Sequence, residues 1–382
     1  AGICVMHVLS VVSFLLERRA RASLPNPGFS PRWGTKLSDL KTKSKSSEMD
    51  NNGAYVLDAV KLEGMVRECH KGICVENGTE ERIFWAEEEE NAVRAVTKLA
   101  VVYIHGFSAS RQENDSLVQA LRTRFKANVF CARLPGHGGK SETGHELRDD
   151  ASMEKYFEAA LDAAYLGLEL GEKIILVGSS TGGALCTWLA AQPSIRPRVD
   201  SLILLSPAYC LASSAYPVLS RLLYYTKVLL PKDLANRIRT WIVETAVGPT
   251  RIIAPKNRRH KTFWTLTYPS PAIIHLVETL MIVDLQDIQE VTCPALIVGC
   301  PTDHAVSWKY TLQKYTASSR SAPTVLVVLN AGEGGESHVL CSDVLSPSTV
   351  PGVIAQSLAF VETYSSLSSS SRKLMADGPK SD

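Results

Sequence analysis

Short runs of consecutive apolar residues alternate along the chain with longer segments in which apolar residues recur every three or four positions. Most of the short runs are rich in Val and Ile and are typical of strands covered on both faces, whereas the longer segments are typical of amphipathic helices. The runs lie at residues 100–105, 128–133, 174–177, 202–206, 295–300 and 325–329, and the helical segments at 115–125, 153–168, 181–191 and 350–361. This alternation predicts an α/β fold, in which helices cover both faces of a mostly parallel central sheet.

The N-terminal residues 1–22 follow a different pattern. They begin with an apolar stretch that contains no Asp, Glu, Lys or Arg before Glu17, and three arginines follow by residue 21. We expect a membrane anchor here, with a signal or transit remnant, or a mistranslated end, as the alternatives. The run is a little short for a spanning helix, which truncation upstream would explain. The arginines would place the following domain on the cytoplasmic side of the membrane.

Three further segments lack the pattern of the core. Residues 23–80 are predicted to form a linker with a short amphipathic helix at 55–66, and the Ser-rich residues 366–382 are predicted to be a disordered tail. The acidic run at residues 87–90 lies between two strand-like segments and predicts a solvated hairpin loop.

The composition fits a globular enzyme better than a nucleic-acid-binding protein. Hydrophobic residues make up 45% of the chain and charged residues 21%, so a sizeable core can be buried. The net charge of +2, without a basic stripe interleaved with aromatic residues, gives no reason to expect a nucleic-acid partner. The nine cysteines are scattered, and no second ligand pair follows Cys69 and Cys74, so neither a disulfide framework nor a metal site is expected.

The strongest chemical motif follows the strand-like run at residues 174–177. Gly178, Ser180 and Gly182 form G-x-S-x-G between this strand and the helix predicted at 181–191, which is the context of a nucleophile elbow. The turn is so tight that only small residues fit around the serine. Ser180 is therefore the candidate nucleophile, whereas Ser179 lacks a glycine two positions before it.

A second loop follows the strand-like run at residues 100–105. In the fold that contains a nucleophile elbow, such a loop supplies one backbone N–H to the oxyanion hole, and the residue after the nucleophile supplies the other. We assign these donors to Phe107 and Thr181. His105 and Gly106 are predicted to support the turn, with His105 packed under the loop rather than acting as a base.

The remaining catalytic candidates follow the two last strand-like runs. Asp303 comes just after the run at 295–300, and His338 lies in the glycine-rich loop after the run at 325–329. The order serine, acid, histidine is the one this fold uses, so we predict the triad Ser180, Asp303 and His338. Several rivals fit less well. They are His304, adjacent to the acid; His137 and His145, which precede the serine; and Glu333 and Glu336, alternative acids close to His338 in sequence.

With these motifs in place, the chain from residue 81 to 365 resembles the α/β-hydrolase superfamily, in particular the group of monoacylglycerol lipases, lysophospholipases and serine aminopeptidase-like proteins. Residues 133–138 are similar to a turn of that group, with a small departure at Leu134 and Pro135. Residues 77–86 and 339–347, together with the apolar N-terminus, resemble a membrane-anchored and poorly characterised branch.

The resemblance implies a domain organisation and a function. The core would comprise residues 81–207 and 288–365, and residues 208–287 would form a helical lid inserted after the sixth strand. Most apolar groups of the lid are expected to form helix core, while its basic residues could contact anionic lipid.

The implied activity is hydrolysis of carboxylic esters, most plausibly of acyl or lipid esters, through an acyl-enzyme. The triad needs no metal, and no G-x-G-x-x-G follows a strand, so no cofactor is expected. An aminopeptidase or amidase and an acyltransferase would use the same triad. A non-catalytic binding protein is the alternative outside enzymes.

Overall fold

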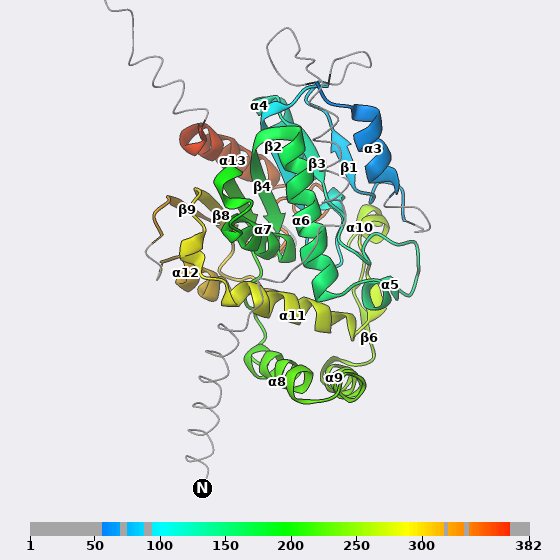
Figure 1. Cartoon of the computed structure of the whole chain (residues 1–382). Coiled ribbons are helices and arrows are strands. Elements are labelled where there is room, and N and C mark those ends of the chain that lie inside the picture. The colour runs from blue at the N-terminus through cyan, green and yellow to red at the C-terminus, as the bar shows by residue number, and fades with distance from the viewer. Residues whose placement is uncertain (1–55, 69–74, 88–93, 317–319, 332–335, 367–382) are drawn as a thin grey trace, which may run out of the picture. The chain divides into compact units, whose positions relative to one another are not determined.

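The computed structural model describes residues 56–68, 75–87, 94–316, 320–331 and 336–366. Within these residues, seven strands form the main sheet in the order β1-β3-β2-β4-β5-β8-β9 (Figure 1). They are β1 (Arg82–Phe84), β2 (Thr97–Ile104), β3 (Asn128–Cys131), β4 (Gly171–Ser179), β5 (Val199–Leu205), β8 (Ala295–Gly299) and β9 (Thr324–Val328). β1 is antiparallel to β3, and every other neighbouring pair is parallel. The predicted mostly parallel α/β sheet is confirmed.

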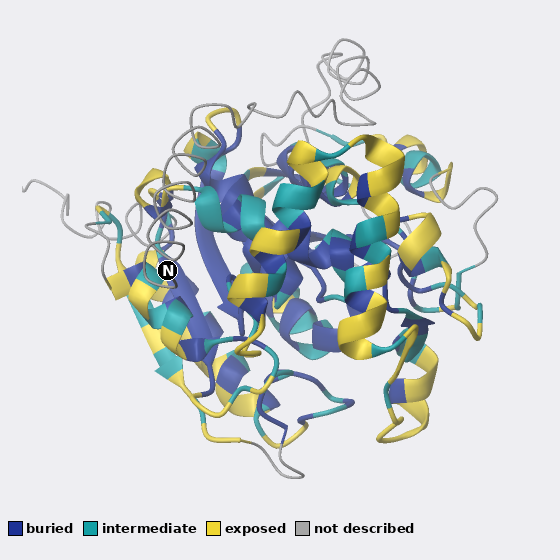
Figure 2. Cartoon of the chain, turned by 90° about the horizontal axis from the view of Figure 1, so that it is seen from below, coloured by how far each residue is buried: buried dark blue, intermediate teal, exposed yellow. Residues whose placement is uncertain are grey.

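Helices cover both faces of this sheet because successive strand residues point to opposite sides. On one face, Val101 and Tyr103 of β2 pack in a cluster with residues of α4 (Asp115–Phe125) and α13 (Val350–Tyr364). On the other face lie α6 (Met153–Leu170) and α7 (Thr181–Ala191), which contact β2, β4 and β5. Figure 2 shows the strands as buried and much of the outer helix surface as exposed.

The helices begin and end close to their predicted residues. α4 and α7 agree with the prediction at both ends, and α3 (Ala59–Glu68) is the short helix expected before the core. The hairpin predicted around residues 87–90 is wrong, because β3 lies between β1 and β2 in the sheet. Strand-like patterns on both sides of a loop do not determine whether those strands pair with one another.

The segment predicted as a lid, residues 208–287, lies between β5 and β8. In chain order β5 is the fifth described strand of the main sheet, so the insertion follows the fifth strand rather than the sixth. Its elements are α8 (Tyr216–Leu229), α9 (Lys232–Val247), β6 (Thr250–Ile252), α10 (Arg258–Phe263), β7 (Thr267–Pro269) and α11 (Ala272–Leu285), followed by the short 3-10 helix η3 (Ile288–Glu290). β6 and β7 pair antiparallel as a separate two-stranded sheet.

The insertion has an inner and an outer part. In the inner part, Thr265 N–H donates to Ser108 O at 2.8 Å, and Trp264 packs against Ala109 and Val344 of the core. The outer part is the pair α8–α9, held to α11 by a small cluster around Leu223 and Val277. α8–α9 exposes several large apolar side chains, among them Val218, Leu229 and Trp241.

The membrane anchor predicted at residues 1–22 and the Cys69 and Cys74 pair lie outside the described residues, as do most of the predicted linker and the tail beyond residue 366. Among the helices of the described ranges, none combines the length and the apolar character that crossing a membrane requires.

A buried ion pair joins β1 to the turn that follows β3. Arg133 Nε lies 2.8 Å from Glu81 Oε2, and each side chain is only 6% exposed. Arg133 also donates from Nη1 to His137 O at 3.1 Å, so it holds the turn that packs against the loop after β2.

We expect Arg133→Ala to lower the free energy of unfolding by about 3–5 kcal/mol, because the Glu81 carboxylate stays buried without its partner. Urea denaturation measures this change. The double variant with Glu81→Ala should be less destabilised than the sum of the two single variants, and strict additivity would contradict a direct interaction.

Candidate active site

Ser180 occupies a sharp turn between β4 and α7. Its φ of 50° and ψ of −115° lie in a region that is strained for a residue with a side chain. Ser180 N–H donates to Leu205 O at 2.9 Å, which ties the turn to β5. The predicted strand–turn–helix context of Ser180 is therefore present.

The glycines around Ser180 are required by contacts rather than by flexibility. A Cβ atom on Gly178 would lie 2.5 Å from the backbone of Gly182. A Cβ atom on Gly182 would lie 2.0 Å from Ile104 O, at the end of β2. Any larger residue would thus separate the turn from the neighbouring strand.

The two other predicted triad residues lie beside Ser180. His338 Nε2 is 3.0 Å from Ser180 Oγ, and His338 Nδ1 is 2.8 Å from Asp303 Oδ2. The second carboxylate oxygen of Asp303 accepts hydrogen bonds from Ala305 N–H at 2.8 Å and Val306 N–H at 3.0 Å. Because both oxygens of Asp303 are occupied, its orientation toward the imidazole is fixed.

The surroundings of His338 favour its protonated form on balance. Burial is the largest influence and disfavours the charge, but the hydrogen bond and negative charge of Asp303 outweigh it and raise the pKa of His338. Glu113 and Glu336 add smaller contributions in the same direction. An imidazole in this position accepts a proton readily from a neighbouring hydroxyl.

Glu336, considered from the sequence as an alternative acid, contacts the backbone instead of the imidazole. Its Oε1 accepts from His338 N–H at 3.0 Å and Val339 N–H at 2.9 Å, and its Oε2 lies 2.7 Å from Lys256 Nζ of the insertion. Burial opposes its ionisation, but Lys256 and the two N–H groups outweigh burial and lower the pKa of Glu336.

The other rivals are placed elsewhere. His304 Nδ1 lies 2.9 Å from Ser337 Oγ, and His145 contacts Ser141 and Thr143 at an exposed turn. His137 packs in a buried aromatic group with its ring centroid 5.1 Å from that of His105. Glu333 lies outside the described residues.

His105 supports the loop after β2. Its Nδ1 lies 2.8 Å from Gly106 O, and its Nε2 accepts from Leu134 N–H at 3.1 Å, so Nδ1 carries the proton. Burial, with a contribution from Arg133, lowers the pKa of His105 to about 4. The ring is therefore neutral at ordinary pH, as a residue that accepts at one nitrogen and donates at the other requires.

Of the two predicted oxyanion donors, Thr181 follows Ser180 in the chain, and Phe107 follows Gly106, whose backbone lies beside Ser180. A Cβ atom on Gly106, the residue before Phe107, would lie 3.2 Å from Ser180 Cβ, and Thr181 is the buried first residue of α7. The Phe107 ring packs edge-on against Tyr268 of the insertion, with centroids 5.6 Å apart. Thr181 N–H, at the start of a helix, has the electrostatic surroundings that favour a negative charge.

Sequence reasoning missed two charged residues near the site, Glu113 and Lys256. Both lie in polar stretches whose pattern resembles solvated surface, and no spacing relative to Ser180 distinguishes them.

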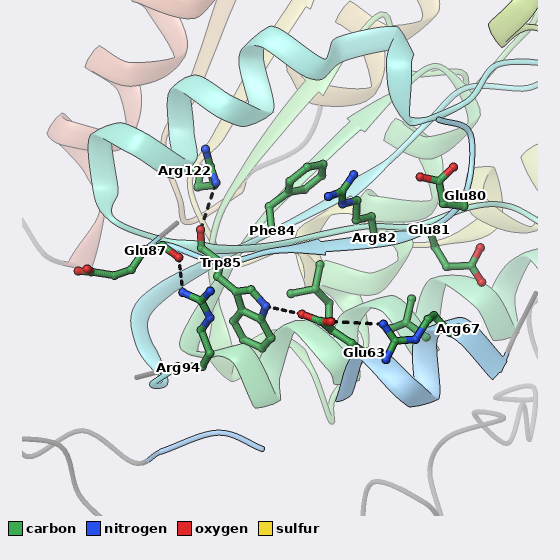
Figure 3. A pocket seen from close by; sticks show the side chains of 12 residues that line it. Glu63, Arg67, Glu80, Glu81, Arg82, Phe84, Trp85, Glu87, Arg94 and Arg122 are labelled. Atoms are coloured by element: carbon green, nitrogen blue, oxygen red, sulfur yellow. Dashed lines mark hydrogen bonds and ion pairs between the residues drawn. The ribbon is translucent and has the colours of Figure 1, made fainter. Parts of the chain in front are cut away.

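A cavity of about 620 Å³ lies on another part of the protein, between α3, β1 and α4 (Figure 3). None of the predicted site residues lines it. Its acidic groups are already engaged: Glu63 accepts from Trp85 Nε1 and pairs with Arg67, while Glu80 pairs with Arg111. We assign no catalytic role to it.

Residues 101–343 match the model of the alpha/beta hydrolase family. The chain belongs to this family. Its sheet order and the strand–turn–helix at Ser180 agree with this membership.

Protein phosphatase methylesterase 1 of Schizosaccharomyces pombe is 30% identical to this α/β-hydrolase over 159 residues, which are 40% of this chain and 45% of that protein. The chain therefore spans less than half the length of this curated relative.

Solved structures share the fold at low identity. A chain described with the metagenome-derived lipolytic enzymes LipS and LipT has a TM-score of 0.54 at 19% identity, covering 76% of this chain and 99% of that chain. A soluble variant of monoglyceride lipase from Saccharomyces cerevisiae has a TM-score of 0.52 at 12% identity, covering 75% and 92%. These two structures therefore share the α/β-hydrolase fold with this chain.

We expect Gly182→Ala to lower the thermal unfolding midpoint, since the added methyl group collides with Ile104 O and overpacking of this kind costs about 1–3 kcal/mol or more. Gly352 in α13 is a matched control, because a Cβ atom there meets nothing within 4 Å. Gly352→Ala should raise the midpoint slightly through helix propensity. Equal midpoints for the two variants would contradict the inferred contact.

Proposed function

We propose that this α/β-hydrolase is a serine hydrolase that cleaves carboxylic esters, with Ser180 as nucleophile, His338 as general base and Asp303 as the acid that orients His338. The observation that supports this most strongly is the continuous chain of hydrogen bonds from Asp303 through His338 to Ser180. The strained turn adds support, because such strain persists where a side chain must be held at a defined position.

The reaction would begin with attack of Ser180 Oγ on the ester carbonyl carbon. His338 Nε2 takes the hydroxyl proton, and Asp303 stabilises the imidazolium that results. The tetrahedral intermediate then collapses, the carbon–oxygen bond of the ester breaks, and His338 returns the proton to the departing alcohol. Water, deprotonated by His338, attacks the acyl-enzyme and releases the acid and free Ser180.

The oxyanion of both intermediates would be stabilised by the backbone N–H groups of Phe107 and Thr181. The hydrogen bonds around His105 and Gly106 support this assignment, because they hold the loop close to Ser180 without using Phe107 N–H. Loss of one such donor typically costs ~100- to 1,000-fold in rate.

The proposed substrate class is an acyl or lipid ester. The aromatic contact between Phe107 and Tyr268 supports apolar surface near the site, and α8–α9 of the insertion exposes further apolar side chains. We propose that only the outer part of the insertion, α8–α9, acts as a lid. The inner part is hydrogen-bonded to the loop after β2. Basic residues of the insertion would then meet anionic lipid, as expected from the sequence.

The alternatives differ in the fate of the acyl-enzyme, in the substrate, or in having no reaction at all. An acyltransferase would pass the acyl group to an alcohol instead of water. An aminopeptidase needs a carboxylate to hold the substrate amine, and Asp233 and Glu244 of α9 are both exposed, which speaks against it. A non-catalytic binder would have no need of the intact hydrogen-bond chain at Ser180.

We expect a fluorophosphonate probe to label the protein covalently at Ser180. Ser180→Ala should abolish labelling, whereas Ser179→Ala, a neighbouring change in the same turn, should still be labelled at Ser180, at a lower rate because Ser179 also acts on Glu113. Folded wild-type protein that resists labelling would refute the proposed chemistry. A series of p-nitrophenyl esters from acetate to palmitate, with a protein methyl ester added because of the methylesterase relative, would then define the substrate class.

Asp303→Asn should lower kcat by about 10⁴-fold, as loss of the orienting acid does in comparable triads. Because Asp303 raises the pKa of His338, and activity requires neutral His338, wild-type activity falls as pH drops through this raised pKa. The acid limb of the kcat/KM profile should therefore move to lower pH in the variant. A limb that stays at the wild-type pH would argue against His338 as the titrating base.

A further inference from the structure

Glu113 is a buried carboxyl group immediately behind the proposed oxyanion loop. It lies in the short 3-10 turn η1 (Arg111–Asn114) before α4 and is only 2% exposed. A methyl group placed on Gly106 would lie 3.2 Å from both Glu113 Oε1 and Ser180 Cβ. The carboxyl group is thus separated from the nucleophile by no more than the loop backbone.

Its hydrogen bonds reach the oxyanion loop and the strand that leads into it. Glu113 Oε2 accepts from Gly106 N–H at 2.8 Å and from Tyr103 Oη–H at 3.1 Å. Ser179, the residue before the nucleophile, acts to lower the pKa of Glu113. Among the described residues, no Lys, Arg or His side chain forms an ion pair with this carboxyl group, so an ion pair does not explain its burial.

Building on the proposed function, we propose that Glu113 is a positioning residue of this active site, whose carboxyl group bridges η1 and Gly106 of the oxyanion loop, beside the nucleophile turn. The bridge keeps this loop at the distance from Ser180 that a developing oxyanion requires.

The backbone of Gly106 shows how the bridge acts. Its N–H is held by Glu113, and its carbonyl oxygen is held by His105 Nδ1 at 2.8 Å and Ala109 N–H at 3.3 Å. The Gly106 carbonyl belongs to the peptide group that carries Phe107 N–H, whereas the Glu113 bond holds the preceding peptide group, so both peptide groups of Gly106 are fixed. Glycine has no side chain to restrain it, so loss of the Glu113 contact would let the Gly106 backbone rotate and shift Phe107 N–H.

The charge of Glu113 also acts on the triad. When ionised, it raises the pKa of His338, as Asp303 and Glu336 do from the other sides of the ring. Burial, the largest influence, raises the pKa of Glu113 itself, against the hydrogen bonds from Gly106 and Tyr103, the influence of Ser179 and the field of His338. Glutamine at this position would retain an acceptor for Gly106 N–H but lose the charge.

Two variants separate these contributions. In Glu113→Ala, kcat for p-nitrophenyl acetate should fall about ten- to a hundredfold with KM within about twofold, because the oxyanion exists only in the transition state and intermediates. In Glu113→Gln, most of kcat should remain, and the acid limb of kcat/KM should move to lower pH because the charge that raises the His338 pKa is gone.

Glu81→Gln is the matched control, since it alters a buried carboxyl group just before β1 whose ion-pair partner is Arg133 rather than a triad residue. It should lower the unfolding midpoint while kcat, KM and the acid limb stay at wild-type values. If Glu113→Ala fails to fold, Glu113→Gln still tests the proposal through the acid limb.

Hydrogen exchange of the Gly106 amide provides a readout that needs no activity. Exchange should be slow in the wild type and about a hundredfold faster in Glu113→Ala, whereas Glu113→Gln should keep it slow. If the wild-type protein is not labelled by the probe but the variants show this exchange pattern, the proposed serine hydrolase activity is refuted. The contact between Glu113 and Gly106 would still be supported. The inference is overturned if both Glu113 variants show the kcat, the acid limb and the Gly106 exchange rate of the wild type.

Discussion

The close contact between Gly182 and the end of β2 is the constraint on which the rest of the site depends. A Cβ atom on Gly182 would lie only 2.0 Å from Ile104 O. The backbone of the first turn of α7 therefore packs directly against the backbone of the last residue of β2. This brings the nucleophile turn and the loop after β2 together without any side chain between them. The strain at Ser180 is the cost of that approach, and the parallel strands on either side hold it in place.

Two carboxyl groups beside His338 are each held by defined partners. Asp303 is held by two backbone N–H groups and by His338, and Glu336 by two N–H groups and Lys256. His105 avoids a charge altogether, because burial keeps it neutral. In the proposed mechanism, the proton that moves between Ser180 and His338 would thus be surrounded by groups held in defined orientations.

The parts of the site that follow from local rules could be predicted from the sequence. The elbow was recognisable because its glycines have a spacing that only a tight turn explains, and Asp303 and His338 because the ends of parallel strands meet at one edge. Glu113 and Lys256 could not be found in this way, since a buried charge in a loop has the same sequence pattern as a solvated one. The place of β1 was missed for a related reason: its partner β3 is determined by tertiary packing, not by the neighbouring loop.

The ion pair between Lys256 and Glu336 ties the insertion to the loop that carries His338. Glu336 braces the loop that carries His338, and its partner comes from residues 208–287. A hydrolase in which this insertion is replaced by another would therefore need a cation at the position of Lys256. Without it, the buried Glu336 carboxylate near His338 would lose its charged partner. Exchange of the insertion between such proteins would thus be constrained at the position of Lys256, even where Ser180, Asp303 and His338 are unchanged.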